Sequence, residues 1–120
     1  MVLDKEKIGV GIVGLGVGEQ HAQMYAELET CDVKWIYDIS YKKSTEVSFR
    51  VGQGDIAKSF EQILTDPNIA VVSLATFDHL HFDEVIAAFN AGKHVFVEKP
   101  LCRSIEELTA MKKCWEDNQH

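Results

Sequence analysis

Short apolar runs alternate with amphipathic stretches along the whole chain. Strands buried on both faces are continuously apolar, whereas surface helices repeat apolar residues at helical spacing, so the pattern predicts strands alternating with helices. The predicted strands are Ile8–Val13, Val33–Tyr37, Asp55–Ala57, Ile69–Ala75 and Val95–Val97. The predicted helices are Glu19–Glu29, Tyr41–Arg50, Ser59–Leu64, His81–Ala91 and a last helix from Ser104 to about Asp117.

Turn and capping residues agree with these elements. Gly92 follows the fourth predicted helix, where a left-handed residue is favoured. Ser104 has Glu107 three residues on, the spacing of a capping box. Alternating strands and helices indicate a parallel sheet, and right-handed crossovers leave few topologies. We therefore expect the α/β fold class, with a doubly wound parallel sheet between two helical layers (three layers, α/β/α).

Composition excludes several classes of function. The 120 residues suffice for one domain, and the net charge is −7 with no basic block, which argues against nucleic acid and anionic membranes as partners. No apolar run approaches the ~20 residues of a membrane span, and the charged amino terminus has no apolar signal region. The odd set Cys31, Cys102 and Cys114 predicts reduced thiols. We expect a cytoplasmic protein.

Two glycine patterns overlap near the amino end. The stretch GVGIVG, from Gly9 to Gly14, matches the dinucleotide fingerprint G-x-G-x-x-G letter for letter. That fingerprint has to follow a strand and open a helix, but Gly9 stands inside or at the entry of a predicted strand. We interpret Gly9 and Gly11 as small residues that allow close packing of this strand.

The later pattern, GLGVGEQHA, has the required context, because a predicted strand precedes it and a predicted helix follows. Gly14 permits a tight turn, Gly16 lets the backbone approach a pyrophosphate, and helix amides from about Gly18 onward point toward the anion. Two alternatives stay open for the third glycine position. Either the loop is one residue shorter than the standard pattern, or Glu19 occupies that position.

Asp38 ends the second predicted strand. A carboxylate there accepts hydrogen bonds from the adenosine ribose and repels a 2′-phosphate, which favours NAD over NADP. Lys42 and Lys43 lie close enough to weaken this preference. A glycine turn followed by an acid also describes a methyltransferase that binds S-adenosylmethionine, which we keep as a lesser alternative.

Residues 73–101 read SLATFDHLHFDEVIAAFNAGKHVFVEKPL. Within them AGKHVFVEKPL resembles the Gfo/Idh/MocA family of oxidoreductases, and GIVGLGVGEQHA resembles the first turn of that family. The resemblance extends from Ile8 to the last helix. It implies a Rossmann fold that binds NAD, with NADP also possible, and hydride transfer between the nicotinamide cofactor and a sugar, cyclitol or related polyol.

The resemblance also implies individual roles. Lys99 is expected to be catalytic, because an ammonium can hydrogen-bond a substrate hydroxyl and stabilise the alkoxide as hydride leaves. Glu98 is expected to accept hydrogen bonds from the nicotinamide ribose, and Thr76 can hydrogen-bond a phosphate or ribose. The expected cofactor-binding residues are Gly14, Leu15, Gly16, Val17, Gly18, Asp38, Ala75, Thr76, His81 and Glu98.

Some positions depart from the family pattern or allow two interpretations. Phe77 and Asp78 replace the usual proline and asparagine, adding bulk and charge where the cofactor is expected to pass. His81 either caps a helix or lies near the cofactor. We interpret His21, His79 and His94 as structural and expect no metal site. The Lys99–Pro100 bond is a candidate for the cis form.

Members of the family are longer and carry a second α/β domain that forms the substrate pocket. We therefore expect this chain to be the nucleotide-binding domain alone, inactive by itself, with the full-length protein forming a homo-oligomer. The alternative from another class is a nucleotide-binding or interaction module without catalysis, which would not need Lys99.

Overall fold

The structure is a computed structural model that describes residues 7–119. Its strands are β1 (Ile8–Val13), β2 (Cys31–Tyr37), β3 (Asp55–Ile56), β4 (Val71–Leu74) and β5 (His94–Val97). Its helices are α1 (Gly18–Glu27), α2 (Tyr41–Val51), α3 (Phe60–Leu64), α4 (His81–Asn90) and α5 (Ile105–Asp117), with a 3₁₀ turn η1 (Asp78–Leu80). The expectation of a charged amino terminus without a signal region falls mainly on residues 1–6, outside the described part.

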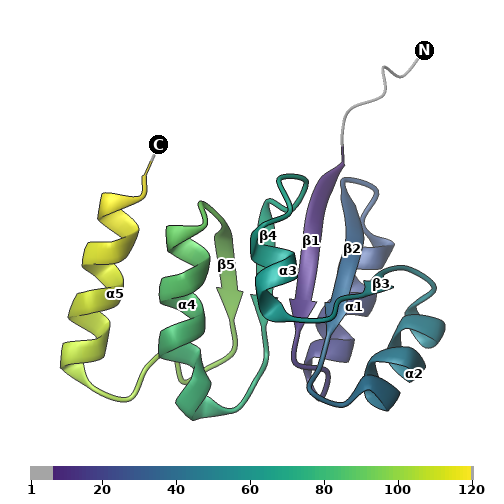
Figure 1. Cartoon of the computed structure of the whole chain (residues 1–120), viewed down its shortest axis with the longest axis horizontal. Helices are drawn as coiled ribbons and strands as arrows, with labels where there is room; N and C mark the ends of the chain where they lie inside the picture. The colour runs from purple at the N-terminus through teal and green to yellow at the C-terminus, as the bar shows by residue number, and fades with distance from the viewer. Residues whose placement is uncertain (1–6, 120) are drawn as a thin grey trace.

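The strands form one parallel sheet in the order β3-β2-β1-β4-β5. The chain starts in the middle of the sheet, adds strands outward on one side, and then crosses to the other side (Figure 1). This order confirms the predicted doubly wound sheet. Where the order of strand addition reverses in this way, between β1 and β4, the loops that follow these two strands diverge and leave a crevice.

Each face of the sheet has its own core, which makes the three predicted layers. On one face, Val10 and Ile12 of β1 pack with Ala22 of α1 and Val47 of α2. On the other face lie residues from the remaining helices: Ile63 of α3, Val85 of α4 and Met111 of α5. Burial of each of these valine, isoleucine and methionine side chains contributes about 1.5–3 kcal/mol, so the hydrophobic effect holds both helical layers against the sheet.

Packing explains the early glycines. A Cβ on Gly11 would lie 2.5 Å from Cγ2 of Ile63, and one on Gly9 would collide with the carbonyl oxygen of Asn68. Both glycines sit inside β1 rather than in a loop. The prediction that they serve close packing, not phosphate binding, agrees with this placement.

The predicted helix ends are confirmed. Ser104 Oγ accepts from the Glu107 amide at 3.1 Å, which is the first half of a capping box, while Glu107 Oε1 accepts from the Arg103 amide at 2.7 Å rather than from that of Ser104. Gly92 has φ 77°, and the Lys93 amide donates to the Ala88 carbonyl at 2.9 Å, which closes a Schellman motif. Lys93 itself is buried at the amino end of β5, where its ammonium donates to the carbonyls of Asp66 and Ile69.

Element boundaries differ modestly from the prediction. β2 begins at Cys31 rather than Val33, because Cys31 and Asp32 pair with the first residues of β1. α1 ends at Glu27 rather than Glu29, because Leu28 has an extended backbone. The turn η1 before α4 was not predicted.

No helix within residues 7–119 is both long and apolar enough to cross a membrane.

Candidate functional site

The last residues of four strands lie in one row across the sheet. Val13 pairs with Tyr37 on one side and with Leu74 on the other, and Leu74 pairs with Val97. The strands are parallel, so the residues that follow this row emerge at the same edge, the lower edge in Figure 1. They are Gly14, Asp38, Ala75 and Glu98. The topology therefore brings together residues that are up to eighty-four positions apart in sequence.

The three glycines of the first loop have different surroundings. Gly14 has φ 85°, and a Cβ there would lie 2.6 Å from the carbonyl oxygen of Ala75, so only glycine suits this turn. Gly18, the first residue of α1, is buried and faces Ala75 and Ile12. Around Gly16 nothing lies within 4 Å of an added Cβ, and its φ is not positive. The fold gives no reason for glycine at Gly16, whereas the approach of a ligand to the backbone would.

Asp38 is tied to the glycine loop. Its Oδ2 accepts from the Leu15 amide at 2.9 Å, and its Oδ1 accepts from the Ser40 amide at the same distance. Each carboxylate oxygen can accept more than one hydrogen bond, so the side chain keeps capacity for a ligand. The end of β2 thus holds an oriented carboxylate beside the loop after β1.

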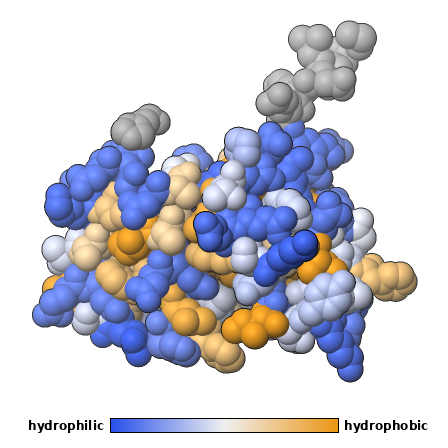
Figure 2. Space-filling model, in the orientation of Figure 1, coloured by the Kyte–Doolittle hydropathy of each residue, from blue (hydrophilic) through white to orange (hydrophobic). Residues whose placement is uncertain are grey.

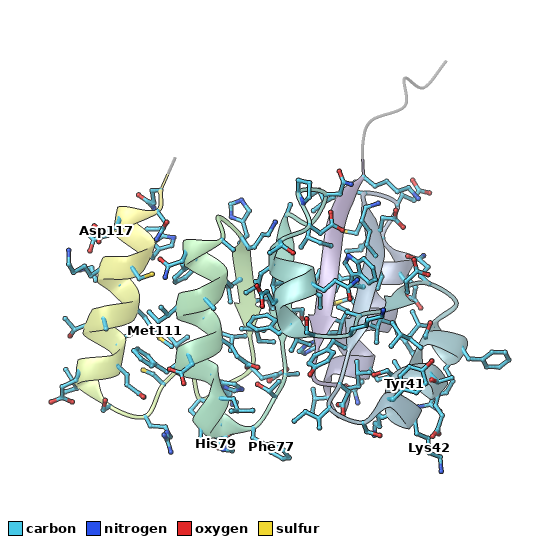
Figure 3. The ribbon with its side chains drawn as sticks, in the orientation of Figure 1. Tyr41, Lys42, Phe77, His79, Met111 and Asp117 are labelled. Carbon is cyan, nitrogen blue, oxygen red and sulfur yellow. The ribbon has the colours of Figure 1, made fainter. Side chains whose placement is uncertain are left out.

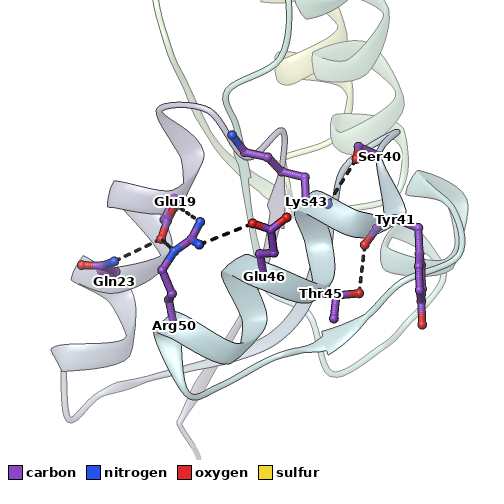
Figure 4. A network of polar contacts seen from close by, with 8 residues as sticks. All are labelled: Glu19, Gln23, Ser40, Tyr41, Lys43, Thr45, Glu46 and Arg50. Carbon is purple, nitrogen blue, oxygen red and sulfur yellow. Dashed lines mark hydrogen bonds and ion pairs between the residues drawn. The ribbon is translucent and has the colours of Figure 1, made fainter.

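Glu19 points away from the glycine loop. Its carboxylate receives two hydrogen bonds from Arg50 of α2, from Nε at 2.6 Å and from Nη2 at 2.8 Å (Figure 4). Arg50 holds the pKa of Glu19 below its usual value. Gly18, not Glu19, therefore provides the small residue where α1 meets β4, which favours the alternative of a shortened loop.

A cleft of about 440 Å³ opens at this edge between the loops after β1, β2 and β4. Six of the expected cofactor-binding residues line it: Gly14, Leu15, Gly16, Asp38, Ala75 and Thr76. Sequence reasoning missed the rest of its wall: Val13, Tyr37, Ile39, Phe60, Leu80 and Glu84. Its volume lies in the range of small-molecule and cofactor sites.

Apolar side chains surround this cleft. Phe77, which replaces the family's proline, lines it and is 69 % exposed, with its ring stacked 6.0 Å from that of His79 (Figure 3). Ile39 and Val17 are also exposed. Apolar surface accordingly appears along the lower edge of the molecule in Figure 2. Val17 and Gly18 themselves are not part of the cleft wall.

A second carboxyl group enters the cleft from α4. The Thr76 hydroxyl donates its proton to Glu84 Oε1, so Thr76 can offer a ligand only an acceptor. Burial raises the pKa of Glu84, and the bond from Thr76 opposes that shift. No sequence signal marked this residue, since its spacing in the helix does not say that it faces the cleft.

His81 lies beneath the loops rather than in the cleft. It is 1 % exposed, and its two ring nitrogens contact the carbonyl oxygens of Pro100, at 2.6 Å, and of Thr76, at 3.1 Å. The ring therefore bridges the loop after β4 and the loop after β5. The Lys99–Pro100 bond is cis, as the sequence suggested.

Glu98 and Lys99 lie at the same edge but outside the cleft wall. Glu98 Oε1 accepts from His21 Nε2 at 2.6 Å, while Lys99 is exposed.

All three cysteines are free. Within the described residues, no three His, Cys, Asp or Glu side chains gather in a way that could hold a metal ion.

These features fit a dinucleotide. Val17, at the cap position of α1, has no polar side chain to accept from the first amides of that helix, so an anion can take that place. The bare backbone at Gly16 gives such an anion access. Asp38 offers a carboxylate for hydroxyl groups, and the apolar wall suits a flat ring.

Comparisons with known proteins agree with this site. Residues 8–120 match the oxidoreductase family with an NAD-binding Rossmann fold. The chain is 36% identical over 115 residues to levoglucosan dehydrogenase of Pseudarthrobacter phenanthrenivorans, a match that covers 88% of this chain and 30% of that protein. It is 31% identical over 110 residues to the scyllo-inositol 2-dehydrogenase (NADP(+)) IolW of Bacillus subtilis, covering 90% of this chain and 30% of that protein.

Solved structures show the same relationship. A levoglucosan dehydrogenase in complex with NADH and levoglucosan superposes with a TM-score of 0.85 at 34% identity, over 93% of this chain and 33% of that one. This chain thus spans about a third of the length of the relatives that it matches. The match favours the dinucleotide interpretation over S-adenosylmethionine. The chain belongs to the oxidoreductase family with an NAD-binding Rossmann fold, the family that its AGKHVFVEKPL motif resembles.

Proposed function

We propose that this chain binds one NAD molecule across the loops after β1, β2, β4 and β5, with NADP as a weaker ligand. The observation that carries the proposal is the register of the four strands, which places Gly14, Asp38, Ala75 and Glu98 side by side at one edge. Ligands of doubly wound sheets bind at this edge.

Each half of the dinucleotide has its residues in this proposal. The amides of Gly16, Val17 and Gly18 hold the pyrophosphate, since those of Gly14 and Leu15 already donate to the Tyr37 carbonyl and to Asp38. Asp38 accepts from the adenosine ribose. Glu98 accepts from the nicotinamide ribose. Thr76 takes part as an acceptor, since its proton is engaged by Glu84. His81 acts as a positioning residue, which its burial between two loops supports.

We propose that the whole protein oxidises or reduces a sugar, cyclitol or related polyol. When bound, the nicotinamide ring supplies the hydride acceptor or donor. Lys99 then donates a hydrogen bond to the reacting substrate oxygen and stabilises negative charge on it. Relatives named for levoglucosan and inositols support this substrate class. The substrate pocket and the subunit contacts of the expected homo-oligomer would come from a second domain.

Calorimetry with the purified chain tests the cofactor. We expect NAD to bind, NADP to bind more weakly, and Asp38→Ala to reduce that difference, because the variant removes the carboxylate that repels a 2′-phosphate. Well-folded protein that gives no heat with either coenzyme would contradict the proposal.

Turnover tests the reaction. A longer gene product containing this chain is assayed with a panel of polyols and NAD, by NADH absorbance. We expect Lys99→Ala to abolish turnover while NAD affinity is retained, with Lys112→Ala, at an exposed lysine of α5 outside the expected cofactor contacts, as the control. Unchanged function in Lys99→Ala would support a non-catalytic module instead.

The three free thiols support placing the protein in a reducing compartment such as the cytoplasm.

A further inference from the structure

A line of polar side chains from three elements ends at the loop after β5. Ser73 Oγ of β4 lies 3.1 Å from His21 Nδ1 of α1, and His21 Nε2 lies 2.6 Å from Glu98 Oε1. Ser73 is fully buried and His21 nearly so. The burial of His21 agrees with a structural residue, but its contact with Glu98 goes beyond packing.

Hydrogen-bond chemistry gives this line a direction. An ionised carboxylate only accepts, so the proton in the contact with Glu98 sits on His21 Nε2. In a neutral ring Nδ1 then accepts from the hydroxyl of Ser73. An aromatic contact further restricts the orientation of the His21 ring. Phe96 packs edge-to-face with it, with ring centroids 5.1 Å apart and ring planes at 85°. His21 is therefore held on three sides.

Glu98, in contrast, needs a partner to be fixed. Its side chain is 34 % exposed, and it follows β5, which pairs with β4 at the end of the described sheet. A carboxylate in such a place loses rotamer freedom when it receives a ligand, and that loss weakens binding. The bond to His21 imposes part of the order beforehand. A carboxylate offers about four acceptor positions, so capacity for ribose hydroxyls remains.

We propose that His21 is a positioning residue that orients Glu98 to receive the nicotinamide ribose, an inference that rests on the proposed function of Glu98. His21 touches neither cofactor nor substrate in this role. It acts only on the nicotinamide half of the dinucleotide, since the adenosine half binds at Asp38, across β4 and β1 in the sheet.

The test compares NAD with ADP, which contains the adenosine and pyrophosphate but no nicotinamide ribose. Calorimetry with the whole chain measures both ligands for His21→Leu, His21→Gln and His21→Asn. A glutamine amide nitrogen reaches about as far as Nε2 and can donate to Glu98, whereas asparagine reaches only about as far as Nδ1. We expect His21→Leu and His21→Asn to weaken NAD roughly tenfold with ADP unchanged, and His21→Gln to recover most of that loss.

Several results would overturn the inference. One is an NAD-to-ADP affinity ratio that all three substitutions leave unchanged; another is equal NAD affinity in His21→Gln and His21→Asn. If His21→Leu does not fold, the comparison of His21→Gln with His21→Asn still tests the inference. When Glu98→Ala is combined with each of these two substitutions, both double variants should bind NAD equally, and a remaining difference would also overturn the inference. Wild-type protein that binds neither ligand would instead overturn the proposed function, and the inference with it.

Discussion

At the scale of single residues, Gly14 and Gly16 are two positions apart but differ in what requires a glycine. The backbone angle of Gly14 and the nearby Ala75 carbonyl exclude a side chain there, whereas nothing in the chain itself excludes one at Gly16. We expect Gly14→Ala to lower the free energy of unfolding by at least about 2 kcal/mol, because it adds left-handed strain and a backbone collision. Chemical denaturation measures this loss.

Gly16→Ala is the matched variant. It should change stability by no more than about 0.5–1 kcal/mol, because the added methyl group meets open space. It should weaken NAD binding roughly tenfold or more, since the methyl group occupies the approach to the backbone. A Gly16→Ala protein with normal NAD affinity would remove the pyrophosphate from this loop.

Glu84 is a partly buried carboxyl group on α4. Its pKa is raised in the folded protein by burial, so the folded state binds more protons than the unfolded state as pH rises above 4.5, the ordinary value. Stability therefore falls with rising pH through the interval between the ordinary and the raised pKa. Glu84→Gln removes this loss and keeps an acceptor for Thr76.

We expect Glu84→Gln to be more stable than wild type at neutral pH and to lose that advantage near pH 4.5, the ordinary value of the carboxyl. It should also bind NAD about threefold more tightly, because one negative charge leaves the cleft. Glu29→Gln, the same substitution at an exposed glutamate just before β2, is the control and should change neither. Melting curves across pH and NAD titrations give both results, and equal behaviour of the two variants would refute this account of Glu84.

Much of the site at this scale followed from the sequence. Gly14, Asp38 and Thr76 were predicted because each ends a recognisable apolar run, and they do share one cleft. Glu84 and Phe60 were not, because their contribution depends on which side of a short helix faces the crevice. The contact of His21 with Glu98 joins residues far apart in the chain, so no local pattern indicates it.

At the scale of elements, the ion pair of Glu19 with Arg50 joins α1 to α2, and Glu46 contributes a weaker contact at 3.8 Å (Figure 4). Arg50 lowers the pKa of Glu19, so the pair stabilises the fold above the ordinary carboxyl pKa and this contribution is lost as pH falls through the lowered value.

Arg50→Gln should therefore lower the melting temperature at neutral pH, and the difference should shrink in acid and in about 0.5 M salt. Lys113→Gln provides the control, because its pair with Asp117 lies on the exposed face of a single helix. A larger effect from Lys113→Gln than from Arg50→Gln would contradict a linking role for the Glu19 pair.

Elements were predicted well where the signal is local, and less well where it is not. β1 and the caps at Ser104 and Gly92 lie at the predicted positions, since β-branched runs and capping residues act within a few positions. The start of β2 depends on pairing with β1, and η1 on the loop that follows β4. Neither dependence is visible in the residues of the element itself.

At the scale of the whole molecule, the strand order decides the function that the site can have. Placing β4 beside β1 opens the crevice, and placing β5 beside β4 brings Glu98 and Lys99 to the same edge. The alternation of strands and helices predicted a doubly wound sheet, and the family match agrees with it. The central claim is that four separate loops at this edge contact one nucleotide.

Amide chemical shifts during a titration with NAD test that claim most directly, since every loop reports separately. We expect saturable shifts that are largest at residues 14–18, near Asp38, at Ala75 and Thr76, and at Glu98 and Lys99. We expect small shifts at the amino ends of the strands, around Asp66 and Lys93. Shifts confined to one loop, shifts centred on that opposite edge, or none in well-folded protein would contradict it.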